Sequence, residues 1–391
     1  MRTAKLKDIT LTITDGKHGD CKNHDGSGYY FISCKDVYDE TIHYENARQI
    51  AEDDFRDADR RTNLAAYDIL ITNSGTIGRM ALVKDIPETR KTTFQKSVAI
   101  VRADTSQVVP NYLYYLLKSK VHDFINSSNG SAQKNLLLST MRDFDISFVD
   151  SFETQHRIAS ILSRYDSLIE NYQKQIKLLE EAAQRLYKEW FVDLHFPGHE
   201  NTKIVDGVPE GWEKKKLVDM VDVQYGYAFD GKMFNSNSEG MPILRIRNIP
   251  DGITSDYTTE EAQDCYIVHN GDIVIGMDGI FHINSWSGGD AYLVQRACSF
   301  RPKEECMKGF IFQAIQEPIK FFEKTLVGAT VAHLGKKHID SIELCIPKNF
   351  ELYKPFSKFY NQRQGLLSQI RLLTEARDRL LPKLMSGEID V

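Results

Sequence analysis

Polar side chains that could read the edges of DNA bases stand in several loops of this 391-residue chain. Arg and Lys hydrogen-bond to guanine, Asn and Gln to adenine, and Ser or Thr to either, mainly in the major groove. The candidates lie where Gly and other small residues predict loops. They are Ser74, Thr76, Arg79, Gln95, Lys96, Gln133, Lys134 and Asn135 in the first half, and Arg245, Arg247, Asn248, His282, Asn284, Gln295, Arg296, His333, Lys336 and Lys337 in the second.

A plain solvated loop would carry the same residue types, so no single position decides between surface and recognition. Repetition favours one pair, because Gln95-Lys96 in the first half resembles Gln295-Arg296 in the second. These loops are therefore a hypothesis about base reading that needs support from the rest of the chain.

Catalytic motifs are missing from the sequence. None of the Gly-Lys pairs is followed by Ser or Thr, as a phosphate-binding P-loop requires, and GxGxxG, GxSxG and HExxH do not occur. No NPPY or DPPY run, with which an amino-methyltransferase grips its target base, is present. The histidines are scattered, and a lone histidine is usually a surface or core residue. The chain therefore has no catalytic residues of its own by this reading.

The cysteines do not form a convincing metal site. Cys21, His24 and Cys34 could be pictured as zinc ligands, but a second close pair is missing and no CxxC spacing occurs. The six cysteines are more typical of reduced thiols in a reducing compartment. No apolar run is long enough for a membrane span and no signal peptide is visible at the start, so we expect no membrane partner and a cytoplasmic protein.

The net charge of −6 weakly disfavours nucleic-acid binding, which depends on Lys and Arg. Charge is unevenly spread, however, with basic clusters at Arg60-Arg61, Lys214 to Lys216 and Lys336 to His338. Local patches, rather than the total, determine the field at a binding face. The composition therefore leaves nucleic acid possible as a partner.

Two long helices are expected to position these loops. From Asp150 onward the chain loses Gly and Pro, and a heptad count from Ile158 places Tyr165, Tyr172, Leu179 and Leu186 at one seam position. Asp150 with Glu153 resembles a capping box, and Pro197-Gly198 follows as a stop signal. The partner seam position holds Ile161, Leu168, Gln175 and Ala182.

A second helix near the end repeats this pattern, since QIKLLEEAAQRLYK at Gln175 is followed by QIRLLTEARDRLLP at Gln369. Its seam would contain Phe359, Leu366, Leu373 and Leu380 at the first position, with Gln362, Gln369 and Ala376 at the partner position. Gln175 and Gln369 would be matching polar residues inside an apolar seam, which fix register at some cost in stability. Pro355 suits the first turn, while Pro382 and Gly387 should kink and end the helix.

The repeat extends into the segments before each helix. YDILITNSG at Tyr67 resembles GDIVIGMDG at Gly271, which aligns Asp68 with Asp272 and Gly75 with Gly279. In the same order, Lys5 parallels Lys216, Ile32 parallels Leu244, and Leu136 parallels Leu334. Similar composition could explain two alike helices, but it does not explain ordered matches in the globular parts. The sequence therefore indicates a tandem duplication.

The expected fold class is α+β, with two similar globular domains separated by two long antiparallel helices in a coiled-coil spacer. A pseudo-twofold axis would relate the halves, because the order is globule, helix, globule, helix. The expected boundaries are residues 1–150 and 197–350 for the globular domains, and 151–196 and 351–391 for the helices. The spacer would be on the order of 50 Å long at ~1.5 Å per residue.

Over essentially its whole length the chain resembles the specificity (S) subunit of Type I restriction-modification systems. The resemblance is carried by the ending LLPKLMSGEIDV at Leu380, by the duplicated order, and by the central segment QHRIASILSRYDSLIENYQKQIKLLEEAAQRLYKEWFVDLHFPGHE. It implies that the globular halves are target-recognition domains, each reading one part of a bipartite sequence in double-stranded DNA. Gln175 to Lys188 and Gln369 to Met385 match the family's spacer helices, which also dock two methyltransferase subunits.

The resemblance also implies a division of chemistry between subunits. Adenine methylation with S-adenosylmethionine belongs to the methyltransferase partner, and the motor and nuclease belong to restriction subunits, so this chain would be non-catalytic and bind no cofactor or metal itself. Two other classes stay open: a two-headed protein-protein scaffold, which the acidic charge favours slightly, and a self-contained nuclease or methyltransferase, which the missing motifs disfavour. A gel shift with random duplex at two salt concentrations separates the scaffold from a DNA-binding protein.

Overall fold

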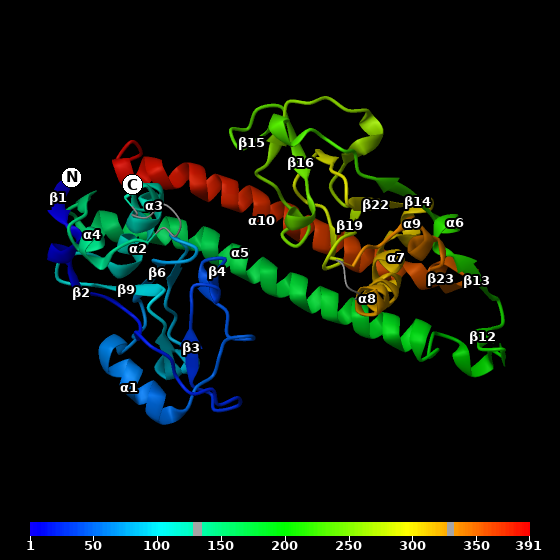
Figure 1. The fold of residues 1–391 in the computed structure, drawn as a ribbon, viewed down its shortest axis with the longest axis horizontal. Helices are drawn as coiled ribbons and strands as arrows, with labels where there is room; N and C mark the ends of the chain where they lie inside the picture. The colour runs from blue at the N-terminus through cyan, green and yellow to red at the C-terminus, as the bar shows by residue number, and fades with distance from the viewer. Residues whose placement is uncertain (128–134, 327–331) are drawn as a thin grey trace. The chain divides into compact units, whose positions relative to one another are not determined.

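The structure is a computed structural model, and it describes residues 1–127, 135–326 and 332–391 (Figure 1). The chain divides into two compact units, each of which combines a globular part with segments of two long helices. The first unit is Met1–Ser167 with Glu375–Val391, and the second is Leu168–Thr374. The first unit is therefore built from both ends of the sequence.

The first unit mixes short helices and mostly antiparallel strands. Its strands are β1 Arg2–Lys5, β2 Thr10–Asp15, β3 Tyr30–Ile32, β4 Val37–Tyr38, β5 Thr41–Ile42, β6 Ile69–Thr72, β7 Met80–Leu82, β8 Thr92–Phe94, β9 Val98–Ala103 and β10 Asp145–Phe148. Its helices are α1 Glu52–Thr62, α2 Pro110–Ser119, α3 Val121–Asn126 and α4 Leu138–Arg142, and α5 Phe152–Tyr187 begins in it. The central sheet has the order β2-β9-β6-β7, β1 pairs with β10, and β3 runs parallel to β8.

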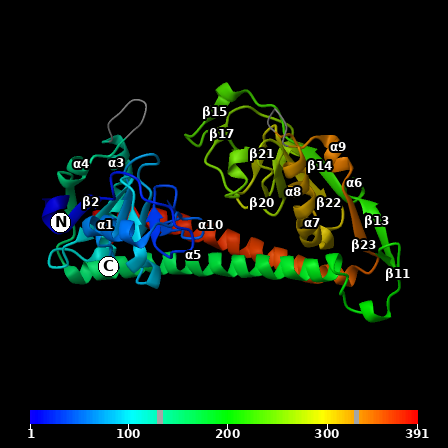
Figure 2. The same cartoon turned by 60° about the horizontal axis from the view of Figure 1, so that its bottom comes forward.

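The second unit has the same kind of architecture. Its strands are β11 Ile204–Val205, β12 Val208–Pro209, β13 Trp212–Lys216, β14 Val221–Tyr225, β15 Phe234–Asn235, β16 Met241–Leu244, β17 Tyr257–Thr258, β18 Ile267–Val268, β19 Ile273–Gly276, β20 Ile283–Ser285, β21 Ala291–Leu293, β22 Ala297–Pro302 and β23 Glu343–Pro347. Its helices are α6 Leu217–Met220, α7 Lys308–Ala314, α8 Gln316–Thr325 and α9 Lys336–Asp340, and α10 Lys354–Ser386 begins in it. The central sheet has the order β14-β22-β19-β20, and β13 pairs with β23. Figure 2 shows α7 and α8 beside β22.

Each central sheet is covered on both faces, which explains its almost uninterrupted apolar strands. In the first unit Ile69 and Ile71 of β6 pack into the core that contains α2, while Leu70 between them packs into a second core on the opposite face. In the second unit Ile273 and Val274 of β19 alternate in the same way. Successive side chains of a strand point to opposite faces, so the alternation follows from strand geometry.

The duplication predicted from the sequence is confirmed by equivalent backbone hydrogen bonds. Lys5 pairs with Asp145 as Lys216 pairs with Glu343. The amide of Leu136 donates to Asn73 O over 2.8 Å, and the amide of Leu334 donates to Met277 O over 2.7 Å. The two units therefore have the same fold, although the residues of the two halves differ at most positions.

One alignment made from the sequence is wrong by a residue. Val98 opposes Thr72 in the first unit, and Ala297 opposes Gly276 in the second. Counting back from these partners, Lys96 is equivalent to Gln295, and Arg296 is equivalent to Ser97. The matching Gln-basic dipeptides are therefore a coincidence of letters, because the strand register rather than the residue type defines equivalence.

Asp68 and Asp272 occupy equivalent positions, as predicted, and each is next to an equivalent arginine. Both carboxylate oxygens of Asp68 bind Arg102, at 2.7 Å from Nε and 2.6 Å from a terminal nitrogen. The corresponding Arg301 lies 3.7 Å from Asp272. The duplication has thus kept the pair while its geometry has loosened in the second unit.

The two long helices pack against each other within each unit. In the first unit Ile158 and Leu162 of α5 share a core with Leu381 and Leu384 of α10. These are the first turns of α5 and the last turns of α10, so the helices run in opposite directions there, as Figure 1 also shows.

The second unit contains the reverse ends of the same helices. Glu180 of α5 binds Arg363 of α10, while further along α5 the ring of Tyr187 lies 6.3 Å from that of Phe356, earlier in α10. Advancing along α5 therefore means going back along α10, which confirms an antiparallel arrangement in this unit. The α-helical part of α5 ends at Tyr187 and continues as a π-helical turn, Lys188–Val192.

The heptad assignment is correct at the first seam position and only partly correct at the partner position. Ile158 is buried, and the other first-position residues, among them Tyr172, Leu179 and Leu373, are half-buried. At the partner position Ile161 and Ala182 are half-buried, but Leu168, Gln362 and Ala376 are exposed. Gln175 and Gln369 are exposed, and the amide of Gln175 donates to Asn171 on its own helix. An α-helix drifts by ~20° per heptad relative to a 3.5-residue repeat, so a strict heptad count moves off the buried stripe. Neither glutamine is therefore a buried register-fixing residue.

The predicted helix ends are largely, but not entirely, confirmed. Pro355 lies in the first turn of α10, and Gly387, at φ 75°, follows its last residue. The start of α5 is different, because Ser151 Oγ accepts from the amide of Thr154 over 3.3 Å and so takes the capping role expected of Asp150. Serine is a preferred N-cap residue, and it stands one position nearer to the helix.

Candidate nucleic-acid interface

Three loop segments of the first unit meet at the end of β6. The amide of Asn73 donates to Ser97 O over 3.0 Å, and Ser74 forms an isolated antiparallel bridge with Asn135. The amide of Gln95 donates to Ile32 O over 2.8 Å. Predicted base-reading residues that are far apart in the sequence are therefore brought together in one place.

The side chains of this loop cluster are mostly accessible. Arg79, Lys96 and Asn135 are exposed, as is Thr76, while Ser74 is half-buried. Gly75 at φ 77° and Gly78 at φ 88° make the tight turns that carry these residues, in a region of backbone space where glycine is favoured. Gln95 is half-buried, and Gln133 and Lys134 lie outside the described residues.

A hollow of about 360 Å³ adjoins this loop cluster in the first unit. Arg79 and Gly78 line it from the loop, and Tyr38 and Glu40 line it from the β4–β5 turn. The Tyr38 ring stacks on His43 with centroids 3.5 Å apart. Arg79 is thus placed beside an aromatic ring and at the rim of an open concave surface.

The equivalent loop cluster of the second unit contains a compact polar cluster around Asp278. Asp278 Oδ1 lies 2.5 Å from His333 Nδ1, and Asp278 Oδ2 lies 3.1 Å from a terminal nitrogen of Arg296. Asp278 also forms an isolated backbone bridge with His333, as Ser74 does with Asn135. Asp278 therefore connects the predicted residues His333 and Arg296. Asp278 itself was not among the predicted residues, although its alignment with Ser74 could have indicated it.

The backbone at Arg296 is unusual for its residue type. Its φ is 71°, in the left-handed region that L-residues other than Gly, Asn and Asp adopt rarely. Such a conformation costs on the order of 1–3 kcal/mol and is typical of functional positions. The side chain is exposed, as is that of the neighbouring Gln295.

Other predicted residues of the second unit stabilise their own loop. Arg247 binds both carboxylate oxygens of Asp256 at 2.6 Å, and this hydrogen bond raises the pKa of Arg247. Asn248 Oδ1 accepts from the amide of Arg245 over 3.0 Å, and the Arg245 guanidinium lies 5.3 Å from the Phe234 ring centroid. A DNA contact by these three residues stays a prediction, alongside the structural role shown here.

Asn284 has its side-chain amide fully engaged within the protein. Its Nδ2 donates to Ile249 O over 2.8 Å and to Pro250 O over 2.9 Å, and its Oδ1 accepts from Arg363 over 2.9 Å. His282, which directly precedes β20, is half-buried. Asn284 therefore holds a loop and a helix together, which sequence spacing could not show.

Lysines at the start of α9 complete the surface of the second unit. Lys336 and Lys337 are exposed, and His338 Nδ1 accepts from the amide of Gly335 over 3.0 Å. No group of three His, Cys, Asp or Glu side chains is placed to hold a metal ion in the part of the chain that the structure describes. Among those residues, no helix is long and apolar enough to cross a bilayer.

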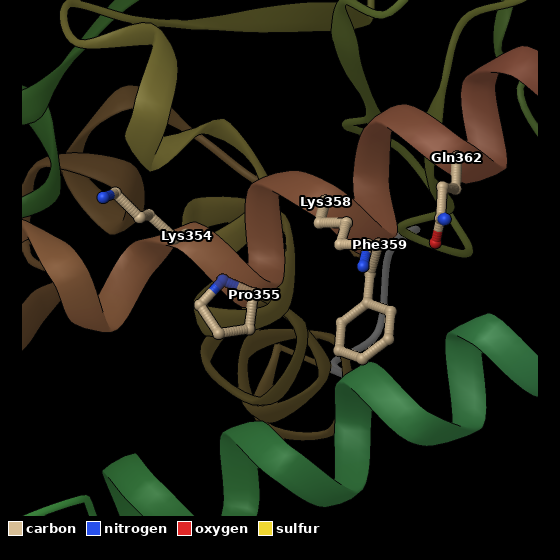
Figure 3. A pocket seen from close by; sticks show the side chains of 5 residues that line it. All are labelled: Lys354, Pro355, Lys358, Phe359 and Gln362. Atoms are coloured by element: carbon tan, nitrogen blue, oxygen red, sulfur yellow. The ribbon is translucent and has the colours of Figure 1, made fainter.

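The long helices offer a separate surface in the second unit. An open hollow of about 500 Å³ lies at the start of α10, lined by Lys354, Pro355, Lys358, Phe359 and Gln362. Figure 3 shows the ring of Phe359 directed towards α5. Phe359 thus contributes to the helix pair, while the two lysines give the hollow a basic character.

Comparison with known proteins agrees with this duplicated organisation. The family model "Type I restriction modification DNA specificity domain" matches residues 3–181 and again 209–371. The Type I restriction enzyme MjaIX specificity subunit of Methanocaldococcus jannaschii is 29% identical, over 83% of this chain and 78% of its own length. A putative MjaX specificity subunit of the same organism is 23% identical, over 99% of this chain and 93% of its own.

A solved structure supports the fold. The S subunit of a Type-I restriction-modification system from M. genitalium superposes with a TM-score of 0.57 at 17% identity, covering 98% of this chain and 96% of that one. At this identity the likeness concerns the fold alone. Since the family model covers most of both halves, the chain belongs to the Type I restriction modification DNA specificity family and is a DNA-specificity subunit.

Proposed function

We propose that each globular part reads one half of a split DNA sequence through the loop cluster at the end of its central sheet. One observation carries the proposal: the same backbone constellation is built twice but holds different side chains. Ser74, Lys96 and Asn135 in the first unit are replaced by Asp278, Gln295 and His333 in the second. A conserved scaffold with different donors and acceptors is what recognition of two different half-sites requires.

In this proposal residues 1–150 and 197–350 are the two target-recognition domains, and residues 151–196 and 351–391 are the spacer helices. The helices set the distance between the half-sites and dock two methyltransferase subunits. Two exposed leucines support a docking role, since Leu178 is 64% exposed and Leu372 is 56% exposed. The repeat that relates Gln175 to Gln369 also relates these two positions, so each helix presents an equivalent apolar side chain to a partner.

The chemistry is assigned to partner subunits. The methyltransferase subunits supply S-adenosylmethionine and transfer its methyl group to adenine, and restriction subunits supply the motor and nuclease. The sequence motifs for these reactions are missing from this chain, which supports a non-catalytic role. Because its substrate is cellular and incoming DNA, we place the complex in the cytoplasm.

Methylome sequencing tests the proposal. The chain is co-expressed with a Type I methyltransferase subunit that co-purifies with it, and the methylated adenines of the host DNA are mapped. We expect a bipartite motif with a fixed non-specific spacer. Replacing residues 1–150 with the corresponding domain of another specificity subunit should change one half of that motif and leave the other intact. A chimera that alters both halves, or a wild-type complex that methylates no split motif, would refute the proposal.

The protein-protein scaffold keeps one observation in its favour, the net charge of −6. A gel shift of the co-expressed complex with random duplex separates the two functions. DNA binding that weakens steeply between about 50 and 200 mM salt supports phosphate contacts. Retained partner binding with no shift at either salt concentration would favour the scaffold.

A further inference from the structure

Two arginines of α10 are buried, although arginine is rarely buried unless it is paired. Arg363 in the second unit is 9% exposed, and Arg377 in the first unit is 5% exposed. Each binds an acidic residue of α5 and an element of the globular part within its own unit. The two side chains therefore add a buried polar contact, here called a grip, to the apolar packing that joins the helices to each globular part.

Arg363 uses all three nitrogens of its guanidinium. Its Nε donates to Glu180 Oε1 over 2.6 Å, one terminal nitrogen donates to Asn284 Oδ1 over 2.9 Å, and the other donates to Ser285 Oγ. The guanidinium lies 5.6 Å from the centroid of the Phe312 ring. The planar fork of arginine makes such a three-way contact possible, and lysine cannot reproduce it.

Arg377 joins α10 to the first globular part. One terminal nitrogen donates to Glu40 over 2.9 Å and to Asp166 of α5 over 2.6 Å. Glu40 in turn binds Lys118 at 2.5 Å, and Asp166 accepts from Tyr115 OH over 2.5 Å. Burial alone would lower the pKa of Arg377, but the carboxylates of Glu40 and Asp166 hold it above its usual value.

The turn that Arg377 holds is a strained one. Asp39 and Glu40, between β4 and β5, have φ values of 46° and 61°. Each such residue costs on the order of 1 kcal/mol, although a two-residue hairpin turn favours this conformation. Arg377 and Lys118 stabilise the turn further by binding both oxygens of Glu40. A residue of the distant helix α10 therefore contributes to the conformation of the turn.

The first grip adjoins its loop cluster, because the Glu40 turn lines the same hollow as Arg79. The second grip is connected to its loop cluster through two strands. Asn284 and Ser285 of β20 pair with Val274 and Ile273 at the start of β19, and the far end of β19 leads into Asp278. A shift of the first grip would therefore move the turn beside Arg79, and a shift of the second would act on the Asp278 loop through β20 and β19.

The duplication does not repeat the grips. The repeat that relates Gln175 to Gln369 relates Arg363 to Ile169 and Arg377 to Ala183. The two arginines are therefore features of α10 that α5 does not share. Their acidic partners on α5, Asp166 and Glu180, are two heptads apart, as the two arginines are, which is the spacing that one antiparallel register requires.

We propose that Arg363 and Arg377 are positioning residues for DNA reading. Through Arg363, α10 fixes the globular part of the second unit, the second head, to the helices. Through Arg377 it fixes the globular part of the first unit, the first head. This inference rests on the proposed function. Each arginine then governs the fidelity of one half-site only, although both lie on the same helix.

The test uses the full chain with its co-expressed methyltransferase. Arg363→Lys keeps the positive charge but loses the three-way fork. Arg377 reaches Glu40 and Asp166 through a single terminal nitrogen, which a lysine amine can replace, so Arg377→Gln is used to remove the charge. Glu40→Gln weakens the first grip from the side of the globular part. We expect Arg377→Gln and Glu40→Gln to accept mismatches in the first head's half-site, with discrimination falling from roughly tenfold or more per base pair to below about threefold. The other half-site should keep its discrimination, and Arg363→Lys should give the reverse pattern.

Mapped methylation motifs and melting curves are recorded for every variant. Arg379→Lys and Arg379→Gln, at an exposed position of α10, are the matched controls and should leave both half-sites unchanged. A purely structural role lowers the melting temperature without selecting a half-site, so equal loss in both half-sites overturns the proposal. Folded variants that keep full discrimination overturn it as well. If the wild type shows no split motif, the proposed function itself fails and this inference falls with it.

Discussion

The duplicated aspartate-arginine pair allows one chain to serve as its own control. We consider Asp68→Asn and Asp272→Asn, which remove the same charge from equivalent positions of the two units. The Asp68 side chain is 2% exposed and that of Arg102 is 26% exposed, with two nitrogens within 2.7 Å of the carboxylate. In the second unit Arg301 is 3.7 Å from Asp272 and is 33% exposed.

These geometries predict unequal costs. Removing one partner of a buried, doubly bonded pair costs ~3–5 kcal/mol, and the partial exposure of Arg102 places Asp68→Asn near ~3 kcal/mol. A longer and more exposed pair is worth ~0–1 kcal/mol, so Asp272→Asn should cost no more than ~1 kcal/mol from this source. The hydrogen bonds that Asp68 and Asp272 accept from the amides of Ala65 and His269 can be retained by asparagine in both variants.

Differential scanning calorimetry and urea denaturation measure the difference. At roughly 2–4 °C per kcal/mol for a unit of this size, Asp68→Asn should lower the melting temperature of the first unit by roughly 6–12 °C. Asp272→Asn should lower that of the second unit by less than about 4 °C. Equal shifts, or a larger shift for Asp272→Asn, would show that pair geometry does not determine the cost and would refute the reasoning.

Three further outcomes are expected. Asp278→Asn releases the Arg296 side chain, now 3.1 Å away, and should change the bases accepted in the second head's half-site; an unchanged methylation motif contradicts this. Burial raises the pKa of Tyr187 to about 12, so the free energy of unfolding should fall as pH rises from about 10 to about 12. Urea denaturation at about pH 9 and about pH 12 measures this fall, and Tyr187→Phe should make it smaller by roughly 2–3 kcal/mol. One heptad inserted after both Leu179 and Leu373 lengthens the helices by ~10 Å and should extend the spacer by about three base pairs or abolish binding; the original spacer at full occupancy would exclude the helices as a ruler.

The duplicated framework was accessible from the sequence because strand pairing depends on local patterns. The alternating apolar runs around Ile69 and Ile273, followed by Gly75 and Gly279, determine which residues pair and where the chain turns. Loop insertions changed the spacing between such blocks but not their order. Among the described residues, the match of residue letters failed at Gln295-Arg296, because the strand register there differs by one residue from the register that the letters suggest.

The sites were less accessible because their partners come from distant segments. The sequence predicts Asn284 as an accessible amide in a loop, but its side chain is hydrogen-bonded to the carbonyl of Pro250 and to the guanidinium of Arg363. Asp278 was not selected, because an acidic residue does not suggest DNA until its contacts with His333 and Arg296 are known. Gln175 failed for a different reason, since a heptad count assumes a supercoil that the buried stripe does not follow.

The discontinuity of the first unit has a consequence for folding. Residues 168–374 are one continuous stretch, so every contact inside the second unit closes within that stretch. The first unit must bring Leu381, Leu384 and Met385 into a core formed by residues of the first 167 positions. Contacts of such long sequence separation form slowly, because the loop-closure entropy opposes them before they contribute any stability. We therefore expect the second unit to complete its folding before the first, although the first begins earlier in the chain.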